Sequence, residues 1–289
     1  MTNLTFDKLP GYIWMNGQFI NWSDAKVHVI NHAMHYASSV FEGNRAYNGK
    51  IFKLEQHTER LFKSAEILDM EIPHSVAEIN QACVDILAKQ GLKSAYLRPI
   101  VWRGSEQMGI SAQNTTINVA IAVWEWPSYF SLADTMKGIR LTAAKYRRPA
   151  PDTAPFRAKA AGLYMICTLS KHAAEAKGYN DALMLDHQGN IAESTGSNIF
   201  FVKNGELHTP DPTSFLDGIT RQTVIQLAQQ AGIKVVVRDI SPSELPSFDE
   251  CFLCGTAMEI MPVAEIDEHR FTPAGITQQL IEAYIQLHG

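Results

Sequence analysis

The sequence predicts an α+β protein of two domains, and three observations lead to this prediction. The chain has 289 residues, more than one average domain, so two units with separate cores are expected. Strand-like and helix-like segments follow one another without regular βαβ alternation, which favours α+β over α/β. The stretch WPSYFSLADTM (126–136) breaks the periodicity between the halves. We therefore expect a first domain over 1–126, a linker over 127–136 and a second domain over 137–289.

The first half begins with two strand pairs that are joined by tight turns. Asn-Gly at 16–17 separates the apolar runs of YIWMNGQFINW, and Asn-Gly at 48–49 does the same in RAYNGKIFKL. Apolar periodicity predicts two helices next, over Leu54–Leu68 and over Val76–Gln90, the second of which Gly91 ends. The segments SAYLRPIVW and INVAIAVWEW are rich in β-branched and aromatic residues and are predicted as strands.

The second half is predicted as a strand, a loop, a helix and a meander of strands. IRLTAAKY is strand-like, and the proline-rich loop RRPAPDTAP leads into FRAKAAGLY (Phe156–Tyr164). A helix is expected over Leu163–Lys177, and the strand-like runs DALMLD, IAES and NIFFVKNGELH follow. Thr220–Gly232 is predicted as a further helix, with VVVRDI and DECFLCG as the last strands.

Composition and charge argue against several classes of protein. The chain is 46% hydrophobic and 19% charged, as is ordinary for a globular protein, and its net charge of −5 argues against extensive nucleic-acid binding. The short basic cluster KYRRP (145–149) is interpreted as a solvated loop. The N-terminus does not resemble a signal peptide, and no apolar run is long enough to span a bilayer. The four cysteines lack framework spacing, which predicts buried, reduced thiols in a cytoplasmic protein without a metal site.

Lys159, in FRAKAAGLY, is the candidate catalytic residue. If this segment were helical, no carboxylate would stand three or four residues away to pair with the amine. A lysine in an apolar setting tends to lose its proton and can then react with a carbonyl as a nucleophile. Taken alone, a surface lysine with a snorkelling stem is the more common interpretation.

Three further features could bind an anion. Arg60 has no acid among its neighbours on the predicted helix, and its guanidinium matches phosphate. Gly218 and Thr220 lie at the expected start of a helix, where free N–H groups and the helix dipole favour phosphate. The turn Gly255–Ala257 is a second glycine-hydroxyl turn after a strand. A solvated arginine and ordinary helix capping remain the alternatives.

Glu193, in NIAESTGSN, completes a set of residues that indicates one cofactor. A surface acid is the simpler interpretation, but a carboxylate buried opposite a ring nitrogen would keep that nitrogen protonated. A reactive lysine, a phosphate site and such an acid together indicate pyridoxal phosphate. The GxGxxG, GxxxxGK[ST] and GxSxG motifs are absent, which argues against nucleotide-binding and hydrolase functions. His32 and His35 lack a third ligand nearby, which is more typical of packing than of a metal site.

Seven segments give the sequence a specific resemblance to a known family. They are, in order, KVHVINHAMHYASSVFEGNRAY, LEQHTERL, SAYLRP, RAKAAGLY, IAESTGSNIF, DGITR and CGTAMEIMPV. With them the chain resembles the fold-type IV pyridoxal-phosphate enzymes (D-amino-acid aminotransferase-like) and, within these, the branched-chain amino-acid aminotransferases. The resemblance implies a small N-terminal α/β domain and a larger, β-rich C-terminal domain that carries the cofactor lysine.

The resemblance also implies roles for individual residues. Lys159 would form a Schiff base with pyridoxal 5'-phosphate and shuttle the proton in the reaction. Cofactor contacts are implied for Arg60, Tyr164, Glu193, Leu216, Gly218, Ile219, Thr220 and Thr256. Substrate contacts are implied for Tyr36, Phe41, Gly43, Arg45, Tyr96, Arg98, Ile110, Trp126, Tyr129, Thr256 and Ala257, with Tyr36 and Ile110 coming from a neighbouring subunit. Arg98 would receive the distal carboxylate of glutamate.

The implied activity is the reversible transfer of the amino group of L-leucine, L-isoleucine or L-valine to 2-oxoglutarate, in a homodimer or a hexamer of three such dimers. A D-amino-acid aminotransferase is one alternative, but it calls for an R-x-H motif that RGSEQMGISAQN lacks. An aminodeoxychorismate lyase and a catalytically idle metabolite-binding protein are the others. Departures from the family pattern at Asn44, Ala161, Leu163 and Asp217 leave the substrate preference open, and Asp217 places a negative charge beside the implied phosphate site.

Overall fold

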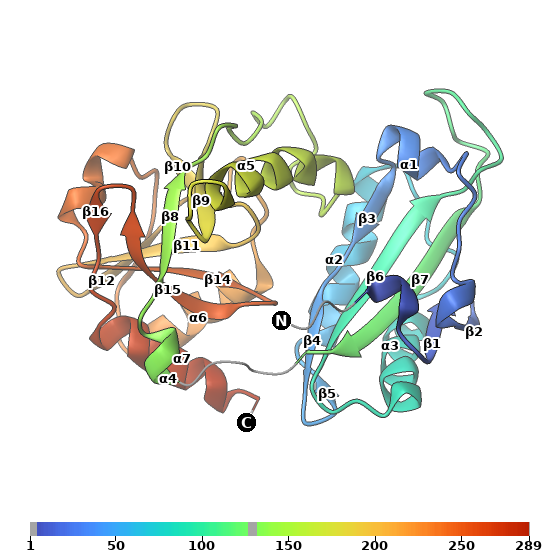
Figure 1. The fold of residues 1–289 in the computed structure, drawn as a ribbon, viewed down its shortest axis with the longest axis horizontal. Helices are drawn as coiled ribbons and strands as arrows, with labels where there is room; N and C mark the ends of the chain where they lie inside the picture. The colour runs from blue at the N-terminus through green and yellow to red at the C-terminus, as the bar shows by residue number, and fades with distance from the viewer. Residues whose placement is uncertain (1–4, 127–131, 289) are drawn as a thin grey trace. The chain divides into compact units, whose positions relative to one another are not determined.

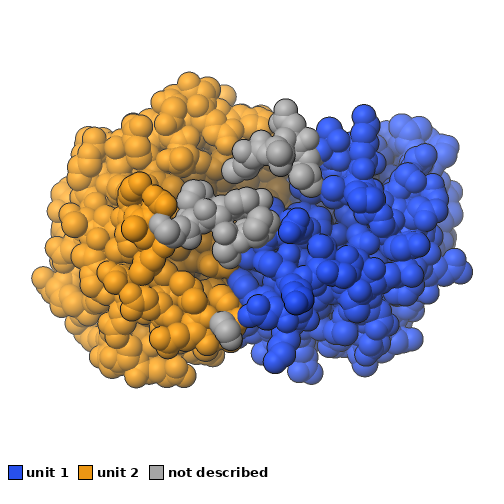
Figure 2. Space-filling model, turned by 60° about the horizontal axis from the view of Figure 1, so that its bottom comes forward, with its two compact units in different colours: residues 1–127, 158–162 blue, residues 128–157, 163–289 orange. Residues whose placement is uncertain are grey.

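The structure, a computed structural model, describes residues 5–126 and 132–288. Contacts within the chain separate two compact units, which Figure 2 draws in different colours. Unit 1 comprises Met1–Pro127 and Ala158–Gly162, and unit 2 comprises Ser128–Arg157 and Leu163–Gly289. The stretch Ala158–Gly162, which carries the candidate lysine, therefore packs with unit 1, whereas the sequence placed it in the second domain. Part of the predicted linker, 127–131, lies outside the described residues.

Unit 1 is an antiparallel sheet with two helices packed on it (Figure 1). The strand order is β2-β1-β7-β6-β4-β5, and β3 lies beside β6. The helices α2 (Leu54–Ile67) and α3 (Val76–Gln90) contact each other and the sheet. The strands are β1 (Tyr12–Met15), β2 (Gln18–Asn21), β3 (Ser39–Phe41), β4 (Asn44–Tyr47), β5 (Lys50–Ile51), β6 (Ala95–Arg103) and β7 (Ile117–Glu125), and the short α1 spans His32–Tyr36.

Local sequence signals explain the elements of unit 1 that were predicted correctly. Asn16 and Gly17 both have positive φ (48° and 87°), as the two-residue turn between β1 and β2 requires. The same holds for Asn48 and Gly49 between β4 and β5. Helix α3 begins with a reciprocal capping box and ends at a glycine in the left-handed region. Both hairpins and both helices are confirmed.

Unit 2 is a nine-stranded sheet that closes on itself. The strand order is β10-β9-β8-β15-β14-β11-β12-β13, with β16 beside β15, and β10 also pairs with β11. Six strands therefore form a closed ring without a free edge. The strands are β8 (Ile139–Ala143), β9 (Asp181–Leu185), β10 (Ile191–Ser194), β11 (Asn198–Lys203), β12 (Glu206–Thr209), β13 (Val235–Val237), β14 (Glu250–Gly255), β15 (Glu259–Ile266) and β16 (His269–Arg270).

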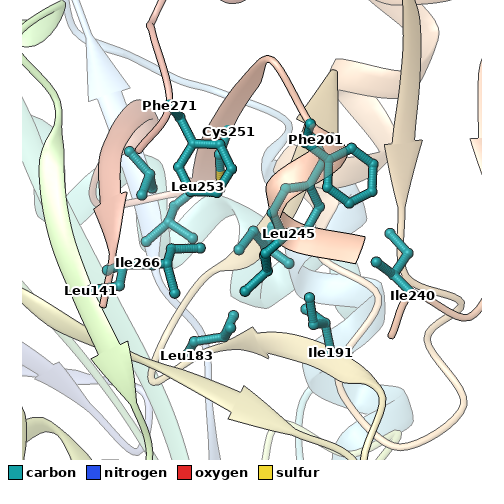
Figure 3. Close-up of a cluster of buried hydrophobic side chains, with 13 residues drawn as sticks. Leu141, Leu183, Ile191, Phe201, Ile240, Leu245, Cys251, Leu253, Ile266 and Phe271 are labelled. Carbon is teal, nitrogen blue, oxygen red and sulfur yellow. The ribbon is translucent and has the colours of Figure 1, made fainter. Parts of the chain in front are cut away.

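The apolar core of unit 2 lies inside this ring, where side chains from all six strands meet (Figure 3). Side chains alternate between the two faces of a strand, so Cys251 and Leu253 of β14 point into this core. Phe252, between them, faces the other way and stacks on Phe200 of β11, with 5.1 Å between ring centroids. Cys251 and Cys254 consequently face opposite sides of β14, and both are buried and unpaired, as their spacing predicted.

Three longer helices accompany the ring. Helix α5 (Met165–Glu175) packs on β8 and β9, and α6 (Ile219–Gln230) and α7 (Gly275–Gln286) pack on each other and on β14. The short α4 spans Leu132–Thr135. The α+β class is confirmed, while β15 and α7 were not predicted. None of the described helices is long and apolar enough to cross a membrane.

Candidate active site

Lys159 lies in an extended stretch of unit 1 and not in a helix. Its backbone is held on both sides: the N–H donates to Ser64 Oγ at 3.0 Å, and the carbonyl accepts from the N–H of Phe41 at 3.1 Å. Ala160 forms a β-bridge with Val40. The half-buried side chain places Nζ 5.0 Å from the centroid of the Phe41 ring. The helical setting considered from the sequence is therefore wrong, but the lysine is firmly anchored beside an aromatic ring.

Helix α2 of unit 1 presents three polar side chains towards this stretch. His57, Arg60 and Ser64 are spaced by three and four residues, so they share one face of the helix. His57 and Ser64 are buried, although the sequence singled out neither. The signal that could have revealed them is this polar stripe on a helix whose other buried positions are largely apolar.

Glu42, in the turn between β3 and β4, is a fully buried carboxylate that pairs with Arg60. Arg60 Nε donates to Oε1 at 2.6 Å and Nη2 donates to Oε2 at 2.9 Å. His57 Nδ1 lies 2.7 Å from Oε2, and the N–H of Gly43 also donates to Oε2, at 3.2 Å. Arg60 therefore has an acid partner from another element, which its helical neighbours could not indicate.

The charge states in this buried cluster follow from the balance between burial and neighbouring charges. Burial alone would raise the pKa of Glu42, but the charge of Arg60 and the hydrogen bonds from His57 and Arg60 outweigh it and hold that pKa well below its usual range. Burial lowers the pKa of His57, against the opposing charge of Glu42. The cluster at neutral pH is therefore an ionised Glu42–Arg60 pair beside a neutral histidine.

Strands β3 and β6 of unit 1 bring aromatic rings around Arg98. Its guanidinium carbon lies 4.8 Å from the centroid of the Phe41 ring and 5.4 Å from that of Tyr96. Arg98 Nη2 also donates to Tyr96 Oη at 3.4 Å, and Trp126 lies beside Tyr96, with 5.3 Å between ring centroids. Arg98 Nε is buried without a hydrogen-bond partner in the described part of the chain. A buried donor of this kind calls for an explanation, and a bound ligand is one.

Gly43 and Arg45 lie in the same part of unit 1. A Cβ at position 43 would lie 1.8 Å from Tyr96 Oη, so only glycine leaves room for this ring. Arg45 is buried, with Nη2 donating to the carbonyl of Trp126 at 3.4 Å and the guanidinium over the Tyr47 ring. Two further predicted substrate residues, Tyr36 and Ile110, are exposed on the surface of unit 1. Tyr129 lies outside the described residues.

His32 links α1 to the loop that carries Ile110. Its Nδ1 lies 2.7 Å from Ser38 Oγ, and its Nε2 lies 2.9 Å from the carbonyl oxygen of Gly109. Both ring nitrogens are thus engaged in hydrogen bonds, and the one from Nε2 to Gly109 holds the loop against the helix. Among the described residues, no group of three or more His, Cys, Asp or Glu side chains could hold a metal ion.

Glu193, in β10 of unit 2, is buried beside a buried cation. Arg148 Nε lies 3.3 Å from Oε1, and Asn198 Nδ2 donates to Oε2 at 3.3 Å. Arg148 is only 5% exposed, and its Nη1 donates to Cys167 Sγ at 3.3 Å. The interpretation of KYRRP as a solvated loop is therefore wrong for Arg148, because the arginine turns inward to meet Glu193. The sequence identified neither Arg148 nor Asn198.

Asn198 also ties Glu193 to the start of α6. Its Nδ2 donates to the carbonyl of Leu216 at 3.0 Å, and its Oδ1 accepts the N–H of Gly218 at 3.1 Å. Gly218 is the N-cap residue of α6 and provides no side-chain cap. A Cβ there would lie 2.2 Å from Asn198 Oδ1, so glycine is required. Ile219 and Thr220 form the first turn, whose N–H groups and dipole favour an anion.

The negative charge of Asp217, just before the start of α6, is compensated by an arginine of that helix. Arg221 is buried, and its Nη1 donates to Asp217 Oδ1 at 2.8 Å, a pair spaced by four residues. Gln222 donates to the other carboxylate oxygen at 3.2 Å. Asp217 therefore acts as the partner of a buried arginine, and the concern about its charge is largely removed.

The remaining predicted cofactor and substrate residues of unit 2 lie at the ends of elements. Tyr164 is half-buried and directly precedes α5. Thr256 and Ala257 form the turn after β14, where Thr256 is half-buried and Ala257 exposed. Gly255, just before them, packs closely on Ser197, since a Cβ would lie 2.9 Å from its Oγ.

The chain matches the family Amino-transferase class IV over residues 39–266, and it belongs to this family. Among curated relatives it is similar to a probable branched-chain-amino-acid aminotransferase of Rickettsia felis, with 42% identity over 92% of this chain and 91% of the relative. The branched-chain-amino-acid aminotransferase of Pseudomonas aeruginosa is 39% identical over 96% and 92% of the two chains.

Solved structures show the same relationship. The branched-chain amino acid aminotransferase of Escherichia coli has a TM-score of 0.91 at 38% identity and covers 97% of this chain and 95% of its own. The branched-chain amino acid aminotransferase of Thermobaculum terrenum in its PLP-form has a TM-score of 0.89 at 33% identity. The match covers 96% of this chain and 94% of that chain. The resemblance read from the seven segments and the fold-type IV architecture are confirmed.

Proposed function

We propose that this chain is a pyridoxal-5'-phosphate-dependent aminotransferase that moves the amino group of L-leucine, L-isoleucine or L-valine to 2-oxoglutarate. The observation that carries the proposal is the anchoring of Lys159, whose backbone is held by Ser64 and Phe41 in an aminotransferase of class IV. Identity of 39–42% to branched-chain-amino-acid aminotransferases favours this activity over a D-amino-acid aminotransferase or an aminodeoxychorismate lyase.

The chemistry of the donor groups fits this cofactor. The uncapped start of α6 at Gly218 and the guanidinium of Arg60 suit a phosphate dianion. The buried carboxylate of Glu193 suits a protonated ring nitrogen, and the hydroxyls of Tyr164 and Thr256 can serve the remaining oxygens. When bound, pyridoxal phosphate supplies an electron sink that stabilises negative charge at the substrate Cα.

The residues around the cofactor have distinct tasks in the proposed reaction. Lys159 would hold the cofactor through its amine at rest and, once its amine is free, would move the proton to and from the substrate Cα. Ser64 fixes the lysine backbone so that the amine stays within reach of that atom. Glu193 retains the proton on the ring nitrogen, and Arg148 and Asn198 each hold one of its carboxylate oxygens.

Substrate binding is assigned to the aromatic group around Arg98. Phe41, Tyr96 and Trp126 offer apolar surface to a branched side chain, and Arg98 offers a charge to the distal carboxylate of glutamate. The turn Thr256–Ala257 is assigned to the α-carboxylate. An apolar wall distinguishes substrates that differ by a methylene by only about 1–3 kcal/mol, so leucine, isoleucine and valine should all react.

Replacing Arg98 by methionine tests the dual use of this pocket. The variant keeps an apolar side chain of similar length but loses the charge-assisted bond to a carboxylate. We expect kcat/KM for glutamate to fall by about 10- to 100-fold and that for leucine to change less than about threefold. Steady-state kinetics with each amino donor measures this difference, and Arg98→Lys is the control that keeps the charge. Equal losses for both substrates would contradict the assignment.

Replacing Gly43 by alanine tests the close approach of Tyr96. The new Cβ would lie 1.8 Å from Tyr96 Oη, so the ring must move out of its position. We expect kcat/KM for leucine to fall by about 10- to 100-fold, because misplacement by an ångström has such an effect. The matched control is Gly275→Ala, where a Cβ meets no atom within 4 Å. Unchanged kinetics in the Gly43 variant would show that Tyr96 does not line the substrate site.

We also propose that a second copy of the chain completes the pocket, so that the active form is at least a dimer. Tyr36 and Ile110 are 42% and 84% exposed, and Val29 and Met34 of the same unit are also exposed apolar side chains. Apolar side chains exposed in number on one unit are typical of interaction surfaces. The cytoplasm is the proposed location, because the four cysteines are buried and unpaired.

A further inference from the structure

We propose that Glu42 and His57 are positioning residues that hold the Arg60 guanidinium in one orientation for the cofactor phosphate, and that they thereby set the preference of the protein for phosphorylated over unphosphorylated cofactor. This inference rests on the proposed function, in which Arg60 binds the phosphate. Both positioning residues belong to unit 1, the unit that also carries Arg60.

The contact between Glu42 and Arg60 fixes the plane of the guanidinium. Two parallel hydrogen bonds, from Nε at 2.6 Å and from Nη2 at 2.9 Å, join one edge of the guanidinium to both carboxylate oxygens. Such a fork-to-fork contact adds geometric specificity to its energy. A guanidinium has five N–H groups, so one arginine side chain can serve a carboxylate and a phosphate together.

The carboxylate is itself prevented from turning. Glu42 is fully buried, and its Oε2 also lies 2.7 Å from His57 Nδ1 and accepts the N–H of Gly43 at 3.2 Å. An ionised carboxylate only accepts hydrogen bonds, so Nδ1 of the neutral His57 carries the ring proton and donates it. The orientation of Arg60 is therefore set before any phosphate arrives, which reduces the entropy lost on binding.

The face of α2 that carries Arg60 also carries Ser64, which anchors the lysine independently of the phosphate-binding arginine. Ser64, one turn beyond Arg60, holds the backbone of Lys159 through a hydrogen bond of its own, which does not pass through the carboxylate of Glu42. A change at Glu42 should therefore weaken the hold on the phosphate and leave the attachment of the pyridoxal ring to Lys159 intact. This difference distinguishes a positioning role from a general structural one.

The test compares pyridoxal 5'-phosphate with pyridoxal, which lacks the phosphate, as ligands of the apoenzyme. The Kd of each is measured by titration of protein fluorescence and of visible absorbance. We expect Glu42→Gln to raise the Kd for pyridoxal 5'-phosphate by about tenfold or more, as loss of a charged hydrogen-bond partner does, and to change the Kd for pyridoxal less than about twofold. Glu66→Gln is the control and should change neither Kd, because Glu66 is an exposed acid of α2, the helix that carries Arg60.

Variants of His57 test the role of that residue, and they also provide the main test if Glu42→Gln does not fold. His57→Leu removes the donor and should raise the Kd for pyridoxal 5'-phosphate selectively, whereas His57→Asn can restore a donor near the position of Nδ1 and should recover much of the affinity. Equal weakening of both ligands in Glu42→Gln or His57→Leu, together with a lower Tm, would show a merely structural role and overturn the inference.

Arg60→Met separates this inference from the proposed function. If this variant keeps the preference for the phosphorylated ligand, the assignment of Arg60 to the phosphate is wrong and the inference falls with it. If Arg60→Met loses the preference but Glu42→Gln keeps it, only the positioning role is overturned. The expected result is that both lose it and that the double variant is no worse than Arg60→Met alone.

Discussion

Replacing Lys159 by alanine is expected to reduce kcat for transfer from leucine to 2-oxoglutarate by roughly 10³- to 10⁴-fold, since the positioned proton carrier is lost. The backbone anchors at Ser64 and Phe41 do not involve the side chain, so the fold should be retained. Turnover is measured with a coupled assay for glutamate, and thermal unfolding checks the fold. Borohydride reduction and peptide mapping should place pyridoxyl on position 159 in the native chain and not in the variant.

The matched control for this variant is Lys63→Ala, which removes an exposed lysine of unit 1 that pairs with Glu66 at 2.8 Å. This change should leave kcat within about twofold, as surface substitutions generally do. If Lys159→Ala kept more than about a tenth of native activity, the lysine would not be the group that moves the proton. An idle binding protein, by contrast, would show no turnover in either variant or in the native chain.

Replacing Glu193 by glutamine is expected to reduce kcat by about 10²- to 10³-fold, the size of effect seen when one preorganised electrostatic contact is removed from a reaction centre. The amide keeps the size of the side chain but no longer carries the charge that retains a proton on the ring nitrogen. Affinity for the cofactor should fall much less than kcat, because the phosphate contacts remain. Steady-state kinetics and cofactor titration measure the two quantities separately.

Arg148, which is buried against Glu193, makes the Glu193→Gln variant harder to interpret, and a second change at Arg148 provides the control. Arg148 loses its charged partner in Glu193→Gln, and breaking one side of a buried ion pair costs about 3–5 kcal/mol of stability. The double variant Glu193→Gln/Arg148→Met removes the unpaired cation and should recover stability without recovering kcat. Glu193→Asp keeps the charge and should lose less activity. Recovery of kcat together with stability would contradict the role of Glu193 on the ring nitrogen.

The sequence predicted those parts of the fold that depend on neighbouring residues. Asn-Gly pairs at 16–17 and 48–49 determine their own turns, and Gly91 ends α3, because positive φ is a local requirement. The pairing of Asp217 with Arg221 is also local, because Asp217 lies just before α6 and Arg221 four residues later in its first turn, and it could have been predicted in the same way. The ring of unit 2 also needs pairings between strands far apart in the sequence, such as β8 with β15 and β11 with β14, and these could not be predicted.

The sequence identified the reactive side chains of the candidate site but not the side chains that hold them in place. Residue patterns pointed to Lys159, Arg60 and Glu193 and the family resemblance gave their roles, whereas several of their partners come from elsewhere in the fold. Glu42 lies in a turn eighteen residues before Arg60, and Arg148 precedes Glu193 in a segment that reads as a basic surface loop. Periodicity shows which face of an element is buried, but it cannot show which buried charge meets which.

The visible spectrum of the purified protein, before and after the addition of L-leucine, tests the central claim most directly. We expect an absorption band of lysine-bound pyridoxal phosphate that fades with L-leucine and returns with 2-oxoglutarate, because the amino group is then taken up and passed on. A band that responds to a D-amino acid and not to L-leucine would contradict the proposed substrate. Absence of any band, even after pyridoxal phosphate is added, would contradict the role of Lys159 itself.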